Sequence, residues 1–326
     1  MTPESPFSPR LDLSGLRAAV DAVRVEVGRI IVGQVDMIDL VLAAILADGH
    51  VLIEGVPGIA KTLTAKLIAR TISVDFSRIQ FTPDLMPSDI TGTSIFNVKT
   101  SEFEFRHGPI FSNVVLIDEI NRAPAKTQAA LFEVMEERQI TVDGTTRPMS
   151  APFMVLATQN PIDQEGTYRL PEAQLDRFIF KIEVGYPSID EETRILRESS
   201  MRATANDLSV VQPVLGADQI ALYRSLVRQV HCDDGLLGYI ARIVDATRNN
   251  NALYLGASPR ASLAIMGSAR AMAAMAGRDF VSPDDIRRVV LPVLRHRILL
   301  TPEKEMEGTT PDEAIRGIVE RIEVPR

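Results

Sequence analysis

The feature that most constrains the fold is a short apolar strand that runs into a glycine-containing loop and then into a helix. Val51–Glu54 is predicted to be a buried strand, and residues 55–62 read Gly-Val-Pro-Gly-Ile-Ala-Lys-Thr. Such a loop turns backbone N–H groups toward an anion, and the N-terminus of the following helix adds partial positive charge. Lys61 can reach phosphate oxygens and Thr62 can hold Mg²⁺. The pattern predicts a loop that binds the phosphates of ATP.

One position departs from the usual phosphate loop, because its last glycine is Ala60. A methyl group is tolerated there only if the residue keeps helical φ, so we expect helical backbone at Ala60. The nucleotide-binding residues predicted around the loop are Gly55, Val56, Pro57, Gly58, Ile59, Ala60, Lys61, Thr62 and Leu63.

A second buried strand ends in two carboxylates. Val114–Asp118 is a run of apolar residues that closes on Asp118, and Glu119 follows it. Asp118 is expected to join Thr62 in binding Mg²⁺, and so to contribute to the nucleotide site. Glu119 is expected to orient the attacking water and to remove its proton. This second carboxylate favours a hydrolase over a protein that only binds nucleotide.

A third strand supplies a polar candidate beside the loop. Phe153–Ala157 runs into Thr158-Gln159-Asn160-Pro161. A side chain at the end of this strand could position the lytic water or sense the γ-phosphate, and we select Asn160. The structural alternative is a turn asparagine before proline.

The order of elements predicts an α/β fold. Continuous apolar strands alternate with helices up to about residue 187, which is typical of a parallel sheet covered on both faces. Two hairpins interrupt this order, one around Lys99-Thr100-Ser101 and one at Asp143-Gly144. Helical patterns dominate beyond residue 187. We therefore predict a mobile tail over 1–10, an α/β nucleotide-binding domain over 11–187 and a smaller all-α lid over 188–326.

Composition limits the classes of partner. The chain has 326 residues and a formal net charge of −8, which argues against a module dedicated to nucleic acid or anionic membranes. Its single cysteine, Cys232, excludes an internal disulfide and fits a reducing compartment. We find neither a membrane-spanning run nor a signal peptide, so the expectation is a cytoplasmic protein without membrane insertion.

These motifs together resemble an AAA+ ATPase, and the family that they resemble most is MoxR. The specific sequences are Ile-Asp-Glu-Ile-Asn-Arg-Ala, Pro-Glu-Ala-Gln-Leu-Asp-Arg-Phe, Gly-Ala-Ser-Pro-Arg-Ala and the loop with its alanine. Ala60 therefore departs from the general phosphate loop but agrees with this family. The matching stretches are Gly55–Thr62, Phe81–Asn97, Gly108–Asp143, Ala157–Phe180 and Gly256–Ala261.

The resemblance implies roles for three further residues. Arg177 matches the arginine finger, which reaches the γ-phosphate bound by a neighbouring subunit. Arg260 matches the second sensor at the start of a lid helix, and Gln34 matches the segment near the adenine. The resemblance also implies that the two hairpins line a pore or face the substrate. For Phe103 and Phe105, packing within their hairpin is the favoured explanation.

At the level of function, the resemblance implies a homo-oligomeric ring, expected to be a hexamer, that hydrolyses ATP with Mg²⁺ and acts on a protein client. The family's tasks are chaperone-like maturation or remodelling of protein complexes, including metal-cofactor insertion, usually beside a protein with a von Willebrand A domain. The main alternative is an AAA+ motor or transcriptional regulator directed to nucleic acid, which the acidic charge and the lack of a helix-turn-helix disfavour. A non-hydrolysing scaffold is disfavoured by Glu119 and Arg177, and an ATP-dependent protease is disfavoured by chain length.

Overall fold

The computed structural model describes residues 11–56, 58–160, 168–201 and 208–325. The predicted tail at residues 1–10 and the loop residue Pro57 lie outside these ranges. The described residues form two compact units. One runs from Ala22 to Ala221 and holds the large sheet, and the other joins the residues up to Asp21 to those from Leu222 onward.

This division differs from the predicted boundary at residue 187. Part of the segment after that residue is attached to the sheet unit by backbone hydrogen bonds, since the N–H groups of Val214 and Leu215 donate to the Thr71 carbonyl at 2.8 and 3.0 Å. Arg70 Nε also donates to the Val211 carbonyl at 3.0 Å. Residues 208–221 therefore belong with the sheet, whereas residues 11–21 belong with the helical unit.

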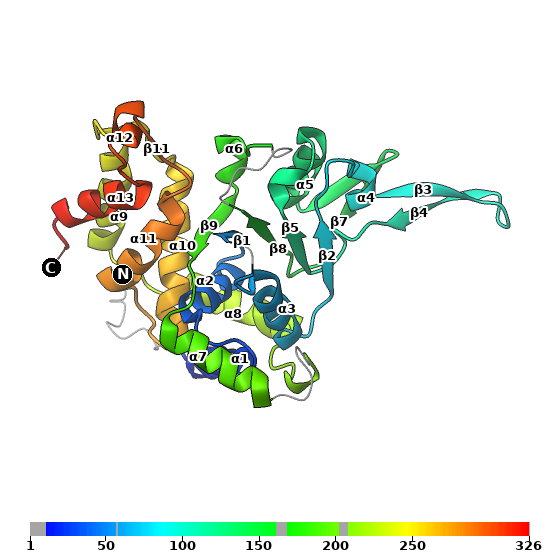
Figure 1. Cartoon of the computed structure of the whole chain (residues 1–326), viewed down its shortest axis with the longest axis horizontal. Helices are drawn as coiled ribbons and strands as arrows, with labels where there is room; N and C mark the ends of the chain where they lie inside the picture. The colour runs from blue at the N-terminus through cyan, green and yellow to red at the C-terminus, as the bar shows by residue number, and fades with distance from the viewer. Residues whose placement is uncertain (1–10, 57, 161–167, 202–207, 326) are drawn as a thin grey trace, which may run out of the picture. The chain divides into compact units, whose positions relative to one another are not determined.

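The sheet unit is built on five parallel strands in the order β2-β5-β8-β1-β9 (Figure 1). These strands are β1 (His50–Gly55), β2 (Phe76–Gln80), β5 (Val114–Asp118), β8 (Met154–Gln159) and β9 (Phe178–Val184). The parallel α/β fold expected from the sequence is confirmed. The edge strand β2 was not predicted, because only Ile79 among its five residues is buried and its other side chains carry no apolar run.

Helices cover this sheet. Helices α2 and α3 contact its strands, and the apolar face of α5 packs with residues of β5 and β8 in one buried cluster that includes Phe132 and Phe178. The helices of this unit are α2 (Val35–Leu46), α3 (Lys61–Thr71), α4 (Pro87–Thr91), α5 (Ala125–Glu137), α6 (Glu172–Leu175) and α7 (Ile189–Met201), with 3-10 turns η1 (Ile120–Arg122) and η2 (Leu208–Val210). Helices α1 (Ser14–Gly28) and α8 (Ala217–Gln229) cross from one unit to the other.

Both predicted hairpins are present. Strands β3 (Gly92–Asn97) and β4 (Glu102–His107) form a long arm that extends away from the sheet (Figure 1), and β6 (Gln139–Val142) pairs with β7 (Thr145–Pro148). The second hairpin turns at Asp143 and Gly144 with φ of 51° and 72°, as the sequence predicted. Phe105 packs under the Arg147 guanidinium, whereas Phe103 is 74% exposed.

The helical unit contains α9 (Asp234–Arg248), α10 (Pro259–Met275), α11 (Pro283–Leu294), α12 (Pro302–Met306) and α13 (Pro311–Arg321). Helix α10 packs against α9 and α11. The unit is not entirely helical, because β10 (Leu253–Leu255) and β11 (Leu299–Leu300) form a two-stranded sheet that the sequence did not indicate.

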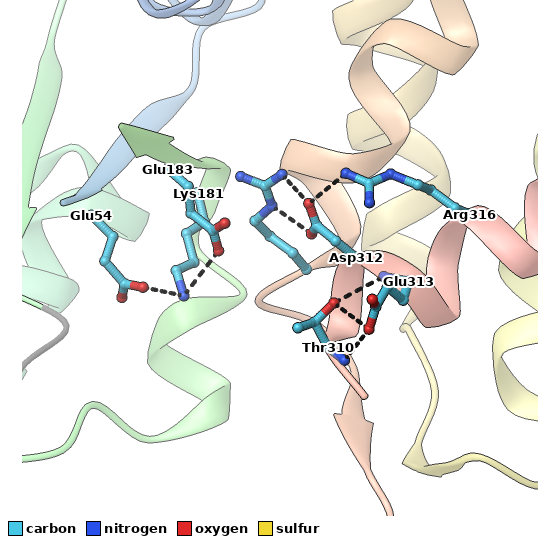
Figure 2. A network of polar contacts seen from close by, with 8 residues as sticks. Glu54, Lys181, Glu183, Thr310, Asp312, Glu313 and Arg316 are labelled. Carbon is cyan, nitrogen blue, oxygen red and sulfur yellow. Dashed lines mark hydrogen bonds and ion pairs between the residues drawn. The ribbon is translucent and has the colours of Figure 1, made fainter. Parts of the chain in front are cut away.

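Polar contacts fix the start of α13 (Figure 2). The Asp312 carboxylate accepts from Arg295 at 2.7 Å and lies 3.5 Å from an Arg316 guanidinium nitrogen. Thr310 caps the helix, since its hydroxyl accepts from the Glu313 N–H at 3.2 Å and Glu313 accepts from the Thr310 N–H at 2.8 Å. Among the described residues, no helix is both long and apolar enough to cross a membrane.

Candidate nucleotide-binding and catalytic site

The predicted phosphate loop connects β1 to α3 at the carboxyl edge of the parallel sheet. A Cβ atom at Gly55 would lie 2.6 Å from the Val184 carbonyl, so only glycine fits there. Ala60 has φ 59° and ψ 21°, which is left-handed helical backbone. The expectation of ordinary helical φ at Ala60 is therefore wrong. The alanine keeps the conformation that a glycine would favour, at a cost of about 1–2 kcal/mol.

Lys61 is directed back onto its own loop. Its ammonium group donates to the Gly55 carbonyl and, at 3.4 Å, to the Gln159 carbonyl at the end of β8. Burial lowers the pKa of this ammonium group, while the charges of Asp118, Glu54 and Glu119 act in the opposite direction. A half-buried cation whose hydrogen bonds go to two backbone carbonyls is well suited to exchange them for the oxygens of a phosphate.

Asp118 is the centre of the polar contacts at the ends of the strands. It is 5% exposed, and its Oδ1 accepts from the Thr62 hydroxyl at 3.1 Å and from the Thr158 hydroxyl at 3.2 Å. Its Oδ2 accepts from Arg78 Nε at 2.6 Å. Residues Thr62 and Asp118 thus bring together two hard oxygen ligands of the kind that Mg²⁺ prefers.

Thr62 and Asp118 fit a Mg²⁺ ion whose remaining ligands come from a bound nucleotide and water. Among the described residues, no group of three or more His, Cys, Asp or Glu side chains could hold a metal ion. A nucleotide-associated Mg²⁺ needs no such group, because it is bound through one or two protein oxygens plus phosphates and water.

Glu119 follows Asp118 in left-handed backbone, with φ 57° and ψ 54°. Its backbone N–H donates to the Thr158 hydroxyl at 3.0 Å. Its carboxylate is engaged on one oxygen, Oε2, by Gln80 Nε2 at 3.1 Å and by Arg122 Nε at 3.0 Å. The candidate base Glu119 therefore directly follows Asp118, the candidate metal ligand, and one of its carboxylate oxygens is held by two donors.

Asn160 directly follows β8, the strand between β5 and β1, and is half-buried. Arg177 lies just before β9, where it donates to the Phe132 carbonyl of α5 and lies 3.9 Å from the Glu136 carboxylate. Arg260 lies in the first turn of α10 in the helical unit and is exposed. That first turn contains no acidic residue.

Gln34 contacts the phosphate loop directly. Its Nε2 donates to the Ile59 carbonyl at 2.6 Å, and its Oε1 accepts from the Thr64 hydroxyl at 3.0 Å. The resemblance placed Gln34 near the adenine, a role that no contact in the structure tests.

Comparison with known proteins places this site in a family. Sequence profiles of the ATPase family associated with various cellular activities (AAA) and of the AAA lid domain match residues 50–180 and 245–318. The chain is 48% identical to the uncharacterized protein YeaC of Bacillus subtilis over 92% of both chains. It is 44% identical to the chaperone MoxR1 of Mycobacterium tuberculosis, over 92% of this chain and 81% of that protein. The chain belongs to the MoxR family of AAA+ ATPases.

A solved structure has the same fold. A candidate ATPase from Cytophaga hutchinsonii, 41% identical, matches with a TM-score of 0.88 over 96% of this chain and 97% of that one. The resemblance inferred from the motifs is therefore confirmed, as are the AAA+ sheet domain followed by a helical lid and the assignment as an ATPase that uses nucleotide.

Sequence reasoning missed three residues that contact Asp118 or Glu119. Arg78 and Gln80 lie on β2, which carried no strand signal, although its pairing with β5 places Gln80 opposite Asp118. Thr158 lies two residues before Asn160, the candidate that the sequence indicates after the third strand. A hydroxyl residue at the carboxyl end of a central parallel strand was the signal that could have identified Thr158.

Proposed function

We propose that this chain forms a homo-hexameric ring in which Mg²⁺-dependent ATP hydrolysis drives chaperone-like remodelling of a protein client. The observation that carries the proposal is the cluster at the carboxyl edge of the sheet. There, Thr62 and Asp118 share a hydrogen bond, and Glu119 follows Asp118. The chaperone name of the Mycobacterium tuberculosis relative supports a protein client.

Each residue then has a defined task in the proposed reaction. Lys61 and the loop N–H groups bind the phosphate oxygens, and Thr62 with Asp118 holds a Mg²⁺ ion, which neutralises phosphate charge when bound. Glu119 accepts the proton of the attacking water, and Asn160 orients that water or contacts the γ-phosphate.

Two arginines complete the proposed site. Arg177 acts on the nucleotide of the neighbouring subunit, and in doing so exchanges its contacts with Phe132 and Glu136 for phosphate oxygens. An arginine finger contributes about 10³–10⁵ in rate. Arg260 contributes a second positive charge from the lid. This arrangement requires oligomerisation for full activity.

Mixing two inactive variants tests the ring. Lys61→Ala removes phosphate binding but keeps Arg177, whereas Arg177→Ala keeps the phosphate loop. In a random ring of both, about a quarter of the interfaces pair an intact loop with an intact arginine. We expect each variant alone to be inactive and the mixture to recover ATPase activity. A mixture that stays inactive, or full activity in a monomer, contradicts the role of Arg177 in trans.

The client is tested by trapping. Glu119→Gln should bind ATP but not hydrolyse it, which holds the ring in its ATP-bound state. We expect Glu119→Gln to retain a protein with a von Willebrand A domain in the presence of ATP. Lys61→Ala, which lacks the phosphate-binding ammonium group, should not retain it. ATPase stimulation by DNA, with salt-sensitive DNA binding, would instead favour a nucleic-acid motor.

A further inference from the structure

Gln34 connects the loop before α2 to the phosphate loop through both ends of its side-chain amide. The Ile59 carbonyl can only accept a hydrogen bond, so the amide atom 2.6 Å from it must be the nitrogen. The carbonyl oxygen of the same amide then faces the Thr64 hydroxyl at 3.0 Å. The Ile59 carbonyl alone fixes the orientation of the amide, and the Thr64 hydroxyl, which can donate, is compatible with it.

Both partners lie on either side of Ala60, the strained residue of the loop. Ile59 precedes it, and the Thr64 hydroxyl also lies 3.1 Å from the Ala60 carbonyl. Ile59 and Thr64 are buried, with exposed fractions of 6% and 0%. Gln34 therefore spans Ala60, which adopts φ 59°, and its two hydrogen bonds oppose relaxation of the loop toward ordinary backbone.

The position of Gln34 is itself held by backbone. Gly33 and Gln34 are consecutive left-handed residues, with φ of 72° and 55°, and the Gln34 carbonyl accepts the Ile38 N–H that starts α2. Glu191 of α7 lies against Gly33, since a Cβ atom there would lie 2.2 Å from its Oε1. The Glu191 carboxylate is fixed in turn by the N–H and hydroxyl groups of Ser188, each at 2.8 Å.

We propose that Gln34 is a positioning residue that holds the phosphate loop in its left-handed conformation, so that it acts on the nucleotide through the phosphates and not through the base. The inference rests on the proposed function only in that ATP binds to this loop. Thr64 has the same positioning role, because its hydroxyl, on α3, is hydrogen-bonded to the Gln34 amide.

Two variants separate this role from a contact with the base. Gln34→Ala removes the amide, and Thr64→Val removes its second partner by a change on α3 that leaves the Gln34 side chain in place. Binding of ATP and GTP is measured by calorimetry for each. We expect both variants to raise the Kd for ATP and the Kd for GTP by a similar factor of about 5–10, so that the preference between the two bases is unchanged. Gln229→Ala, which removes an exposed amide bonded to Ser225 in the helical unit, is the control.

Hydrogen exchange gives a readout that does not depend on nucleotide. In the nucleotide-free protein, both variants should speed exchange at the amides of residues 58–62, whereas the Gln229→Ala control should not. A changed ATP-to-GTP preference in Gln34→Ala alone overturns the proposal in favour of a base contact. Unchanged binding and exchange in Thr64→Val also overturns it. If the wild-type protein fails to bind ATP, or if Lys61→Ala binds ATP as tightly as the wild type, the proposed function fails instead.

Discussion

Arg78 Nε lies 2.6 Å from Asp118 Oδ2, so the carboxylate expected to bind Mg²⁺ is paired with a cation from the edge strand. Asp118 is buried, whereas the Arg78 side chain is 46% exposed. Arg78→Met therefore leaves a buried carboxylate without its cation. We expect the free energy of unfolding, measured by urea denaturation in EDTA, to fall by about 1–2 kcal/mol, less than for a fully buried pair.

The loss should shrink when Mg²⁺ and ADP are added, because the ion then supplies the positive charge that Arg78 provided. Arg194→Met removes an exposed ion pair with Glu198 and should change stability by less than about 0.5 kcal/mol. An equal loss in EDTA and in Mg-ADP would show that Arg78 only packs against its neighbours.

Thr158 links the two acidic residues at the end of β5. Its hydroxyl donates to Asp118 and accepts the Glu119 N–H, and the residue is 4% exposed. Thr158→Val keeps the shape but leaves the Glu119 N–H without an acceptor. We expect a loss of about 1–3 kcal/mol in stability and a fall in kcat larger than the change in KM. Thr158→Ser should restore both, and an unchanged kcat in Thr158→Val would refute the link.

Lys181 neutralises a carboxylate beside the phosphate loop. Its ammonium group lies 3.0 Å from Glu54, the residue before Gly55, and 3.8 Å from Glu183 (Figure 2). Lys181→Met leaves the Glu54 charge uncompensated close to the bound phosphates, so we expect the Kd for ATP to rise about fivefold, or about 1 kcal/mol. The double variant with Glu54→Gln should recover wild-type affinity. Glu183→Gln should change the Kd for ATP little, because the Glu183 carboxylate lies farther from Lys181 than Glu54 does.

The sequence predicted the parts of the site that are local. The strand, loop and helix around residues 50–71 and the run ending at Asp118 are continuous in the chain, and apolar periodicity with glycine is enough to find them. The family resemblance added Arg177 and Arg260, which residue patterns alone would have left as surface charges.

What the sequence could not predict depends on partners that are distant in the chain. Thr158 meets Asp118 across 40 residues and Gln34 meets Ile59 across 25, and only the register of strands and the packing of loops bring them together. Strand β2 was missed because a sheet edge does not require a continuous apolar run. Ala60 was misjudged because intrinsic preference disfavours left-handed alanine, whereas contacts from Gln34 and Thr64 support it.

Ala60 gives a direct test of backbone strain in the loop. Ala60→Gly relieves the left-handed penalty of about 1–2 kcal/mol and adds about 0.5–1 kcal/mol of glycine entropy. We therefore expect no loss of stability and a gain of up to about 1.5 kcal/mol in urea denaturation. Ala18→Gly, at an exposed position with ordinary backbone inside α1, should lose about 0.5–1 kcal/mol. Equal losses in the two variants would contradict strain at Ala60.

Lys61 makes nucleotide binding sensitive to alkaline pH. Burial lowers the pKa of its ammonium group below the ordinary value of 10.5, so in the nucleotide-free protein it loses its proton earlier than an exposed lysine. Phosphate favours the charged form, so binding takes up a proton, and affinity falls as the pH rises through the lowered pKa. We expect the Kd for ATP from calorimetry to rise by up to about tenfold per pH unit in the alkaline range below 10.5. Lys61→Arg stays protonated and should bind more weakly without that rise. The same rise in both proteins would exclude Lys61 as its source.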